Sequence, residues 1–175
     1  MKILISGIAG SGKTSVTKLL AKKLGYNLFS IGSIMREMAL ERGISLLELS
    51  KIAENDKSID EELDKRQIEI GKKEDNFVMD SRLGWYFIPD AVKVYLDATE
   101  EEAAKRILNA KREHETYKDI NESLEKVKRR IHSEEKRYKE YYNIDYKDKK
   151  NHDIIVNTMD KGVEEVVQEI MKRLD

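Results

Sequence analysis

The segment that most constrains the fold is Gly7-Ile8-Ala9-Gly10-Ser11-Gly12-Lys13-Thr14, near the start of the 175-residue chain. It fits the pattern G-x-x-x-x-G-K-[ST] and directly follows the apolar run Ile3-Leu4-Ile5. After it, apolar side chains recur at helical spacing, at Val16, Leu19, Leu20 and Leu24. A glycine-rich turn between a buried strand and a helix points backbone N–H groups at an anion. The sequence therefore predicts a phosphate-binding loop in an α/β fold.

This loop predicts how a nucleoside triphosphate would be held. Lys13 is expected to reach the β and γ phosphates, and the Thr14 hydroxyl is expected to bind Mg²⁺. A chance glycine turn is the alternative, and the matching strand and helix on either side make it the weaker one. The predicted ATP contacts in this segment are Gly7, Ile8, Ala9, Gly10, Ser11, Gly12, Lys13, Thr14 and Ser15.

A second carboxylate at a strand end should hold Mg²⁺ through water, and two aspartates qualify. Asp80 closes the run Phe77-Val78-Met79 and is followed by Ser81-Arg82, which puts a cation beside the phosphates. Asp97 precedes Thr99, a helix-capping residue, and is more simply a strand-end residue. Asp80 is therefore the preferred candidate, although strand ends alone do not decide between them.

Short β-rich runs alternate with long charged helical stretches, which predicts a five-stranded parallel sheet with helices on both faces, the P-loop NTPase fold. Continuous apolar runs such as Ile154-Ile155-Val156 suggest strands that are covered on both faces. Capping boxes predict helix starts at Ser45, Ser58 and Thr99, each with a Glu three residues later. The expected strands are Lys2–Ser6, Asn27–Ile31, Asn76–Asp80, Val92–Asp97 and Asp153–Asn157.

Length and composition favour one domain over residues 1–175 that acts on small molecules. The 33 Lys and Arg residues nearly cancel the 34 Asp and Glu residues, which argues against a nucleic-acid binder. Cysteine is absent and no apolar run could span a membrane, so we expect a cytoplasmic monomer without membrane contact. The three histidines, His114, His132 and His152, lack metal-ligand spacing and are expected at the surface.

Phosphoryl transfer requires neutralisation of charge, which draws attention to arginines in the two long helical insertions, about 34–73 and about 103–142. Arg130 and Arg137 are seven residues apart in a helical stretch and should share one face, about 10 Å apart along the axis. A transferring phosphate could lie between them. The alternative is a solvated helix with Glu–Arg pairs, which the spacing alone does not exclude.

The chain resembles the nucleoside-monophosphate kinases, and most closely the archaeal type of cytidylate kinase, across essentially its whole length. The order and spacing of the matching segments agree as well. These segments are Gly7 to Thr14, Ser30 to Glu37, Ile59 to Gln67, Asp80-Ser81-Arg82, Val94 to Ala98 and Ser133 to Tyr138.

The resemblance implies roles for further residues. Arg36 would bind the acceptor phosphate, with Arg66 a weaker candidate, and Arg82 would lie near the transferring phosphate. The insertion at about 34–73 would bind the acceptor nucleotide, and a lid at about 110–142 would close Arg130 and Arg137 over both phosphate chains. Arg106 would stack on the adenine of ATP, although an exposed helix surface explains it almost as well.

One departure separates subtypes within the family. Bacterial cytidylate kinases follow the strand-end Arg with an Asp that reads the acceptor base, whereas Arg82 here precedes Leu83-Gly84-Trp85. The base-reading groups are therefore expected on the acceptor insertion, where Asp60, Asp64 and Gln67 are available. Trp85 could stack on a base, but an isolated Trp more often fills a core or its rim.

The expected reaction is transfer from ATP, with Mg²⁺, to CMP or dCMP. An adenylate, shikimate or gluconate type of kinase is one alternative, and an RNA-assembly or switch ATPase is another. The tyrosines near Tyr142 could suggest RNA stacking, but packing around the lid explains them better, because no RNA-binding module accompanies them.

Overall fold

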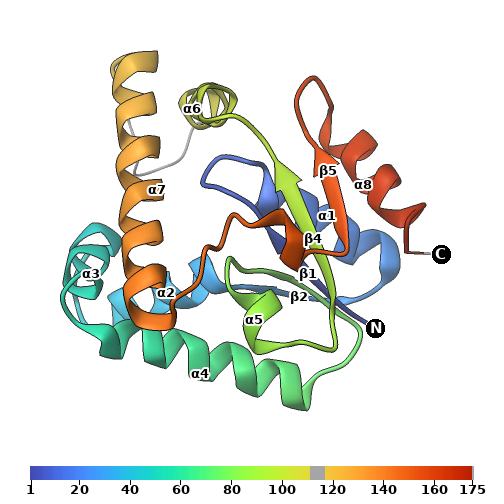
Figure 1. Ribbon diagram of the computed structural model, residues 1–175, viewed down its shortest axis with the longest axis horizontal. Helices are drawn as coiled ribbons and strands as arrows, with labels where there is room; N and C mark the ends of the chain where they lie inside the picture. Colours follow the sequence, from blue (N-terminus) through green and yellow to red (C-terminus); the bar gives the residue numbers. More distant parts are fainter. Residues whose placement is uncertain (111–116, 175) are drawn as a thin grey trace.

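A computed structural model describes residues 1–110 and 117–174 (Figure 1). Its centre is a parallel sheet in the order β2-β3-β1-β4-β5, which confirms the predicted five-stranded α/β fold. Each strand agrees with its predicted range to within one residue at either end. The strands are β1 (Lys2–Ser6), β2 (Asn27–Ser30), β3 (Phe77–Asp80), β4 (Val92–Asp97) and β5 (Ile154–Asn157).

Helices cover both faces of this sheet because the central strands are apolar on both sides. In β1, Ile3 and Ile5 pack with α1 and α8, while Leu4 faces the opposite layer with Phe77 and Ile88. In the described part of the chain, no helix is long and apolar enough to cross a membrane. The helices are α1 (Lys13–Leu24), α2 (Ile31–Glu41), α3 (Leu46–Ala53), α4 (Lys57–Lys73), α5 (Gly84–Phe87), α6 (Glu100–Asn109), α7 (Ile120–Tyr142) and α8 (Val163–Met171), with a 3₁₀ turn at Lys149–Asn151.

The edge strand β5 departs from the expected burial on both faces. Ile154 and Val156 lie in the core with α1 and α8, but Ile155 points to the other side and is 38% exposed. The prediction for Ile155 was wrong because a continuous apolar run does not distinguish an edge strand from a central one.

Two of the three predicted helix starts are correct. Ser45 and Glu48 form a complete capping box, and the Thr99 hydroxyl accepts a hydrogen bond from the Glu102 backbone N–H. The start predicted at Ser58 was wrong. Helix α4 begins at Lys57, because the Asp56 carboxylate caps it by accepting a hydrogen bond from the Ser58 N–H.

The two insertions contact each other. Helices α2, α3 and α4 form the first, and α6 and α7 belong to the second, of which residues 111–116 lie outside the described residues. Figure 1 shows the carboxyl-terminal half of α7 beside α3 and above α4. There the Ser133 hydroxyl donates to Glu54 at 2.8 Å, and the Tyr141 hydroxyl donates to the Ala53 carbonyl at 3.2 Å.

His152 was expected at the surface, and the structure contradicts this. Its side chain is 9% exposed, and its ring lies 5.0 Å from the Tyr95 ring and 5.9 Å from the Trp85 ring. Neither ring nitrogen has a hydrogen-bond partner in the described part of the chain. His132 is exposed as expected, and His114 lies outside the described residues. A sequence without metal-ligand spacing could not distinguish a surface histidine from one inside an aromatic cluster.

Burial lowers the pKa of His152, which predicts a pH-dependent stability. Because the folded protein disfavours the charged ring, the stabilising effect is full above the unfolded pKa of about 6.5 and is lost as the pH falls below it. As the pH falls from 7.5 to 5.5, the thermal unfolding temperature of His152→Phe should rise relative to that of the parent. His132→Phe controls for removing a histidine. A parent-to-variant difference that does not change with pH would contradict this.

Candidate functional site

The cavity that holds the predicted site has a volume of about 430 Å³ and lies beyond the carboxyl ends of β1 and β3. Strand β1 lies between β3 and β4. The strands that follow it, β2 and β3, lie on one side of it, and β4 and β5 lie on the other, so the strand order reverses at β1. Ligands of open parallel sheets bind in the crevice at such a reversal of strand order. The walls are the loop at residues 9–16, the start of α2, one face of α4, residues 80–83, parts of α6 and α7, and the turn before α8.

The glycines of the loop are required by backbone geometry. Gly7, Gly10 and Gly12 all have positive φ, at 142°, 81° and 92°. A Cβ on Gly7 would lie 2.6 Å from the Leu96 carbonyl oxygen, and one on Gly10 would lie 2.7 Å from that of Ala103. The loop is therefore pressed against the end of β4 and the start of α6, where a side chain cannot fit.

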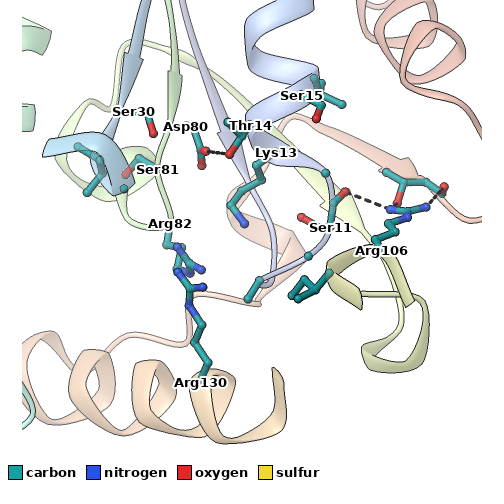
Figure 2. A pocket seen from close by; sticks show the side chains of 18 of the residues that line it. Ser11, Lys13, Thr14, Ser15, Ser30, Asp80, Ser81, Arg82, Arg106 and Arg130 are labelled. Atoms are coloured by element: carbon teal, nitrogen blue, oxygen red, sulfur yellow. Dashed lines mark hydrogen bonds between the residues drawn. The ribbon is translucent and has the colours of Figure 1, made fainter. Parts of the chain in front are cut away.

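Lys13 extends from the start of α1 into the cavity (Figure 2). Its Nζ donates hydrogen bonds to the carbonyls of Gly7 at 2.8 Å and Ile8 at 2.7 Å. Burial, followed by the positive charge of Arg82, lowers the pKa of Lys13 to about 7 against the opposing charges of Asp80 and Glu134. An anion bound beside the amine would raise its pKa again, because it favours the charged form.

Thr14 and Asp80 meet at the cavity wall. The Thr14 hydroxyl donates to Asp80 Oδ2 at 2.9 Å, whereas Asp97 accepts from Lys149 at 2.6 Å. The structure thus brings Asp80, and not Asp97, to the loop. A hydroxyl and a carboxylate oxygen suit a hard cation such as Mg²⁺, which takes its other ligands from phosphate and water.

Four of the predicted arginines line the cavity, namely Arg36, Arg82, Arg106 and Arg130. Arg82 and Arg130 approach each other from opposite sides in Figure 2, and both pair with Glu134, at 2.5 Å and 3.3 Å. Arg36 contacts the Ser33 hydroxyl at 3.0 Å. Sequence reasoning did not select Glu134, although its place four residues after Arg130 and three before Arg137 on one helix was visible.

Arg137 and Arg66 do not reach the cavity. Arg137 was expected to share a phosphate with Arg130, but its Nε lies 3.4 Å from Asp60, so it ties α7 to α4. Arg66 pairs with Glu62 at 2.8 Å and Glu41 at 3.7 Å on the flank of α4. Helical spacing explains the latter: positions 60, 64 and 67 face the cavity, and position 66 is rotated away from them.

The acidic face of α4 is joined to its surroundings by hydrogen bonds. Gln67 Nε2 donates to Asp64 Oδ1 at 2.9 Å, and the Ser81 hydroxyl donates to Gln67 Oε1 at 2.8 Å. The Tyr142 hydroxyl donates a very short hydrogen bond to Asp64 Oδ2. Burial raises the pKa of Asp64 to about 6, and burial also raises the pKa of Asp60 against the charge of Arg137. Tyr142 and Ser81 were not predicted as site residues.

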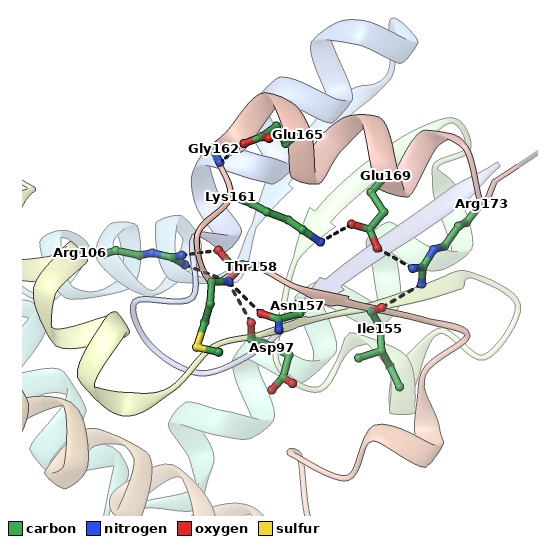
Figure 3. Close-up of polar contacts among 11 residues, drawn as sticks. Asp97, Arg106, Ile155, Asn157, Thr158, Lys161, Gly162, Glu165, Glu169 and Arg173 are labelled. Carbon is green, nitrogen blue, oxygen red and sulfur yellow. Dashed lines mark hydrogen bonds and ion pairs between the residues drawn. The ribbon is translucent and has the colours of Figure 1, made fainter.

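Arg106 lies at the opposite rim of the cavity from α4. It donates to the Thr158 hydroxyl at 3.0 Å and carbonyl at 2.6 Å (Figure 3), and to the Ser11 carbonyl at 3.3 Å (Figure 2). These acceptors fix the edge of the guanidinium plane and tie α6 to the loop. The cavity wall beside it is formed by Ile107, Ala110, Lys161, Gly162 and Val163.

Comparison with known proteins gives one consistent family. Residues 2–160 match the model of the cytidylate kinase-like family. Two similar curated relatives are each called a cytidylate kinase: that of Methanobrevibacter smithii is 38% identical, over 99% of this chain and 98% of the relative, and that of Methanocaldococcus jannaschii is 40% identical, over 100% and 98%.

Solved structures show the same fold at lower identity. A shikimate kinase from Bacteroides thetaiotaomicron matches with a TM-score of 0.71 and 17% identity, over 99% of this chain and 98% of the other. A gluconokinase from Sinorhizobium meliloti matches with a TM-score of 0.62 and 17% identity, over 99% and 92%.

The lowered pKa of Lys13 predicts that binding of a nucleoside diphosphate takes up a proton. Above about pH 8 the free amine is largely neutral while the phosphates are fully ionised, and their charge should raise the pKa again. Titration calorimetry with ADP, in buffers of different ionisation enthalpy, should show uptake of about one proton. Lys13→Met should abolish it. An enthalpy independent of buffer in the parent would contradict the prediction.

Proposed function

Because the chain belongs to the cytidylate kinase-like family, we propose that it transfers the γ-phosphoryl group of ATP to CMP or dCMP, giving ADP and CDP or dCDP. The observation that carries the proposal is a single cavity that joins the phosphate-binding loop to arginines and to the acidic face of α4. One end of the cavity suits a donor triphosphate, and the other suits a nucleotide that carries both a phosphate and a polar base.

ATP is assigned to the end formed by the loop and Arg106. Backbone N–H groups of the loop and Lys13 would hold the β and γ phosphates, and the adenine would lie against Arg106 and the turn before α8. Thr14 and Asp80 would hold Mg²⁺, Asp80 through water. When bound, Mg²⁺ supplies positive charge between the phosphates.

The acceptor is assigned to the end between α2 and α4. Arg36 would bind its phosphate, and the base would face the hydrogen-bonded chain of Asp64, Gln67 and Ser81. Asp60 remains a further candidate at this wall, although its pairing with Arg137 already engages one oxygen.

Transfer is proposed to occur in line, without a covalent enzyme intermediate. Lys13, Arg82 and Arg130 would stabilise the charge that spreads over the transferring group. Arg137 is assigned a positioning role, since it holds α7 against α4 through Asp60. Closure of the two insertions over both nucleotides would exclude water, so that ATP is not lost to hydrolysis.

A panel of monophosphates with ATP as donor tests the proposed function. We expect the highest kcat/KM with CMP and dCMP, a lower value with UMP, and very little turnover of AMP or GMP. AMP as the best acceptor would indicate an adenylate kinase. Turnover of shikimate or gluconate, with no monophosphate accepted, would indicate a metabolite kinase, and ATP hydrolysis without any acceptor would favour a switch ATPase.

The acidic wall predicts the selectivity between CMP and UMP. The 4-amino group of cytosine donates a hydrogen bond, and the Asp64 carboxylate can accept it, whereas the uracil carbonyl would leave two acceptors facing each other. Such a mismatch costs roughly 1 to 3 kcal/mol. Asp64→Asn, with an amide donor, should therefore lower the CMP to UMP ratio of kcat/KM by about tenfold or more.

Tyr142→Phe is the matched control for Asp64→Asn, because it removes the hydrogen bond to Asp64 and keeps the carboxylate. It should preserve the preference for CMP. If Asp64→Asn lowers kcat/KM equally for CMP and UMP, Asp64 only supports the cavity wall and does not distinguish the two bases.

A further inference from the structure

Glu134 is a buried carboxylate at which three separate elements of the chain converge. It lies on α7 with a side chain that is 9% exposed. Its Oε2 lies 2.5 Å from Nε of Arg82, which follows β3, and its Oε1 lies 3.3 Å from Nε of Arg130 on α7. Tyr146, in the segment between α7 and β5, donates its hydroxyl proton to Oε2 at 3.2 Å.

Glu134 contacts the inner edge of each guanidinium group and leaves the terminal nitrogens available. Nε, on the inner edge of the group, is the atom of each arginine nearest to Glu134. Arg130 donates a hydrogen bond from it, whereas Arg82 makes an ion pair that lacks hydrogen-bond geometry. Within residues 1–110 and 117–174, the terminal nitrogens of Arg82 and Arg130 donate no hydrogen bond. Both arginines line the cavity and Glu134 does not, so the carboxylate lies behind them. The two terminal nitrogens of each group present parallel N–H donors, which is the geometry that bidentate phosphate binding requires.

Charge explains why a carboxylate is needed at this place. Arg82 and Arg130 are brought together from different elements and repel each other, with Lys13 close by. Burial opposes ionisation of Glu134, but the charges of Arg82, Arg130 and Lys13 outweigh it and hold its pKa below the usual value. The carboxylate therefore stays ionised, and it offsets the repulsion that would otherwise separate the two guanidinium groups.

We propose that Glu134 is a positioning residue for phosphoryl transfer, which holds Arg82 and Arg130 by their Nε atoms so that their terminal nitrogens grip one phosphate together. This inference rests on the proposed kinase activity. It assigns to Glu134 no contact with substrate and no transfer of a proton. Its effect is to fix two cations from distant parts of the chain, 48 residues apart by their numbers 82 and 130, in a single arrangement.

Glu134→Gln tests the proposal, because it keeps the shape of the side chain and removes its charge. We expect kcat with ATP and CMP to fall by about tenfold or more, as for the loss of a preorganised electrostatic contact. The KM values should stay level or fall, because the cavity gains one net positive charge that attracts phosphate. A side chain that only maintained the fold would lower the folded fraction when changed, so kcat is expressed per folded enzyme and thermal unfolding of each variant is measured beside it. Glu134→Asp, which keeps the charge, should recover part of kcat.

Glu125→Gln is the matched control on the same helix. Glu125 is also paired with an arginine four residues later, Arg129 at 3.7 Å, but both side chains are largely exposed. Its kinetics should equal those of the parent. An unchanged kcat in Glu134→Gln, whether or not KM rises, would overturn the proposal for Glu134. The proposed function would still stand in that case, provided that the parent phosphorylates CMP.

A second measurement does not depend on turnover. In nitrogen-15 NMR spectra, the Nε–H proton of Arg130, which donates to Glu134, should exchange more slowly with water in the parent than in Glu134→Gln. Exchange that is equally fast in both would overturn the pairing itself. If the parent phosphorylates no monophosphate, the proposed function fails, and this measurement still decides whether Glu134 holds the arginine.

Discussion

Buried positive charge at the carboxyl edge of the sheet sets the requirement that the surrounding structure meets. Lys13 and Arg82 follow β1 and β3 at this edge, where burial disfavours the charged form of each. An isolated charge in such a place costs several kcal/mol, so each cation needs a partner. Backbone carbonyls of the loop accept from Lys13, and Glu134 pairs with Arg82. The same buried cations suit the binding of negatively charged phosphate groups.

Contacts between the two insertions depend on the same region. Arg137 pairs with Asp60, and Tyr142 donates to Asp64, so the two acidic residues that face the cavity are each held from α7. Because Asp64 accepts from Gln67, and Gln67 accepts from Ser81 just after β3, the cavity wall on α4 is continuous with the segment that carries Arg82. Movement of α7 would therefore change the position of this cavity wall and of the arginines together.

The fold alone does not select a substrate. A shikimate kinase and a gluconokinase share the architecture at 17% identity, which is a likeness of fold only. Under the proposed function, the choice of acceptor has to come from side chains of the cavity wall, among them Asp64 and Gln67.

The amino-acid sequence by itself determined the loop, the five strands and two helix starts, because each is encoded by neighbouring residues: the glycines from Gly7 to Gly12, the apolar runs, and the caps at Ser45 and Thr99. Asp56 took the place of Ser58 as a cap because the two compete within one turn. Tertiary structure decided the partners of side chains that are distant in sequence. Arg137 turned to Asp60, Glu134 joined Arg82, and His152 entered an aromatic cluster. Local pattern cannot specify these outcomes, because a long charged or aromatic side chain takes its position from whichever elements the fold packs against it.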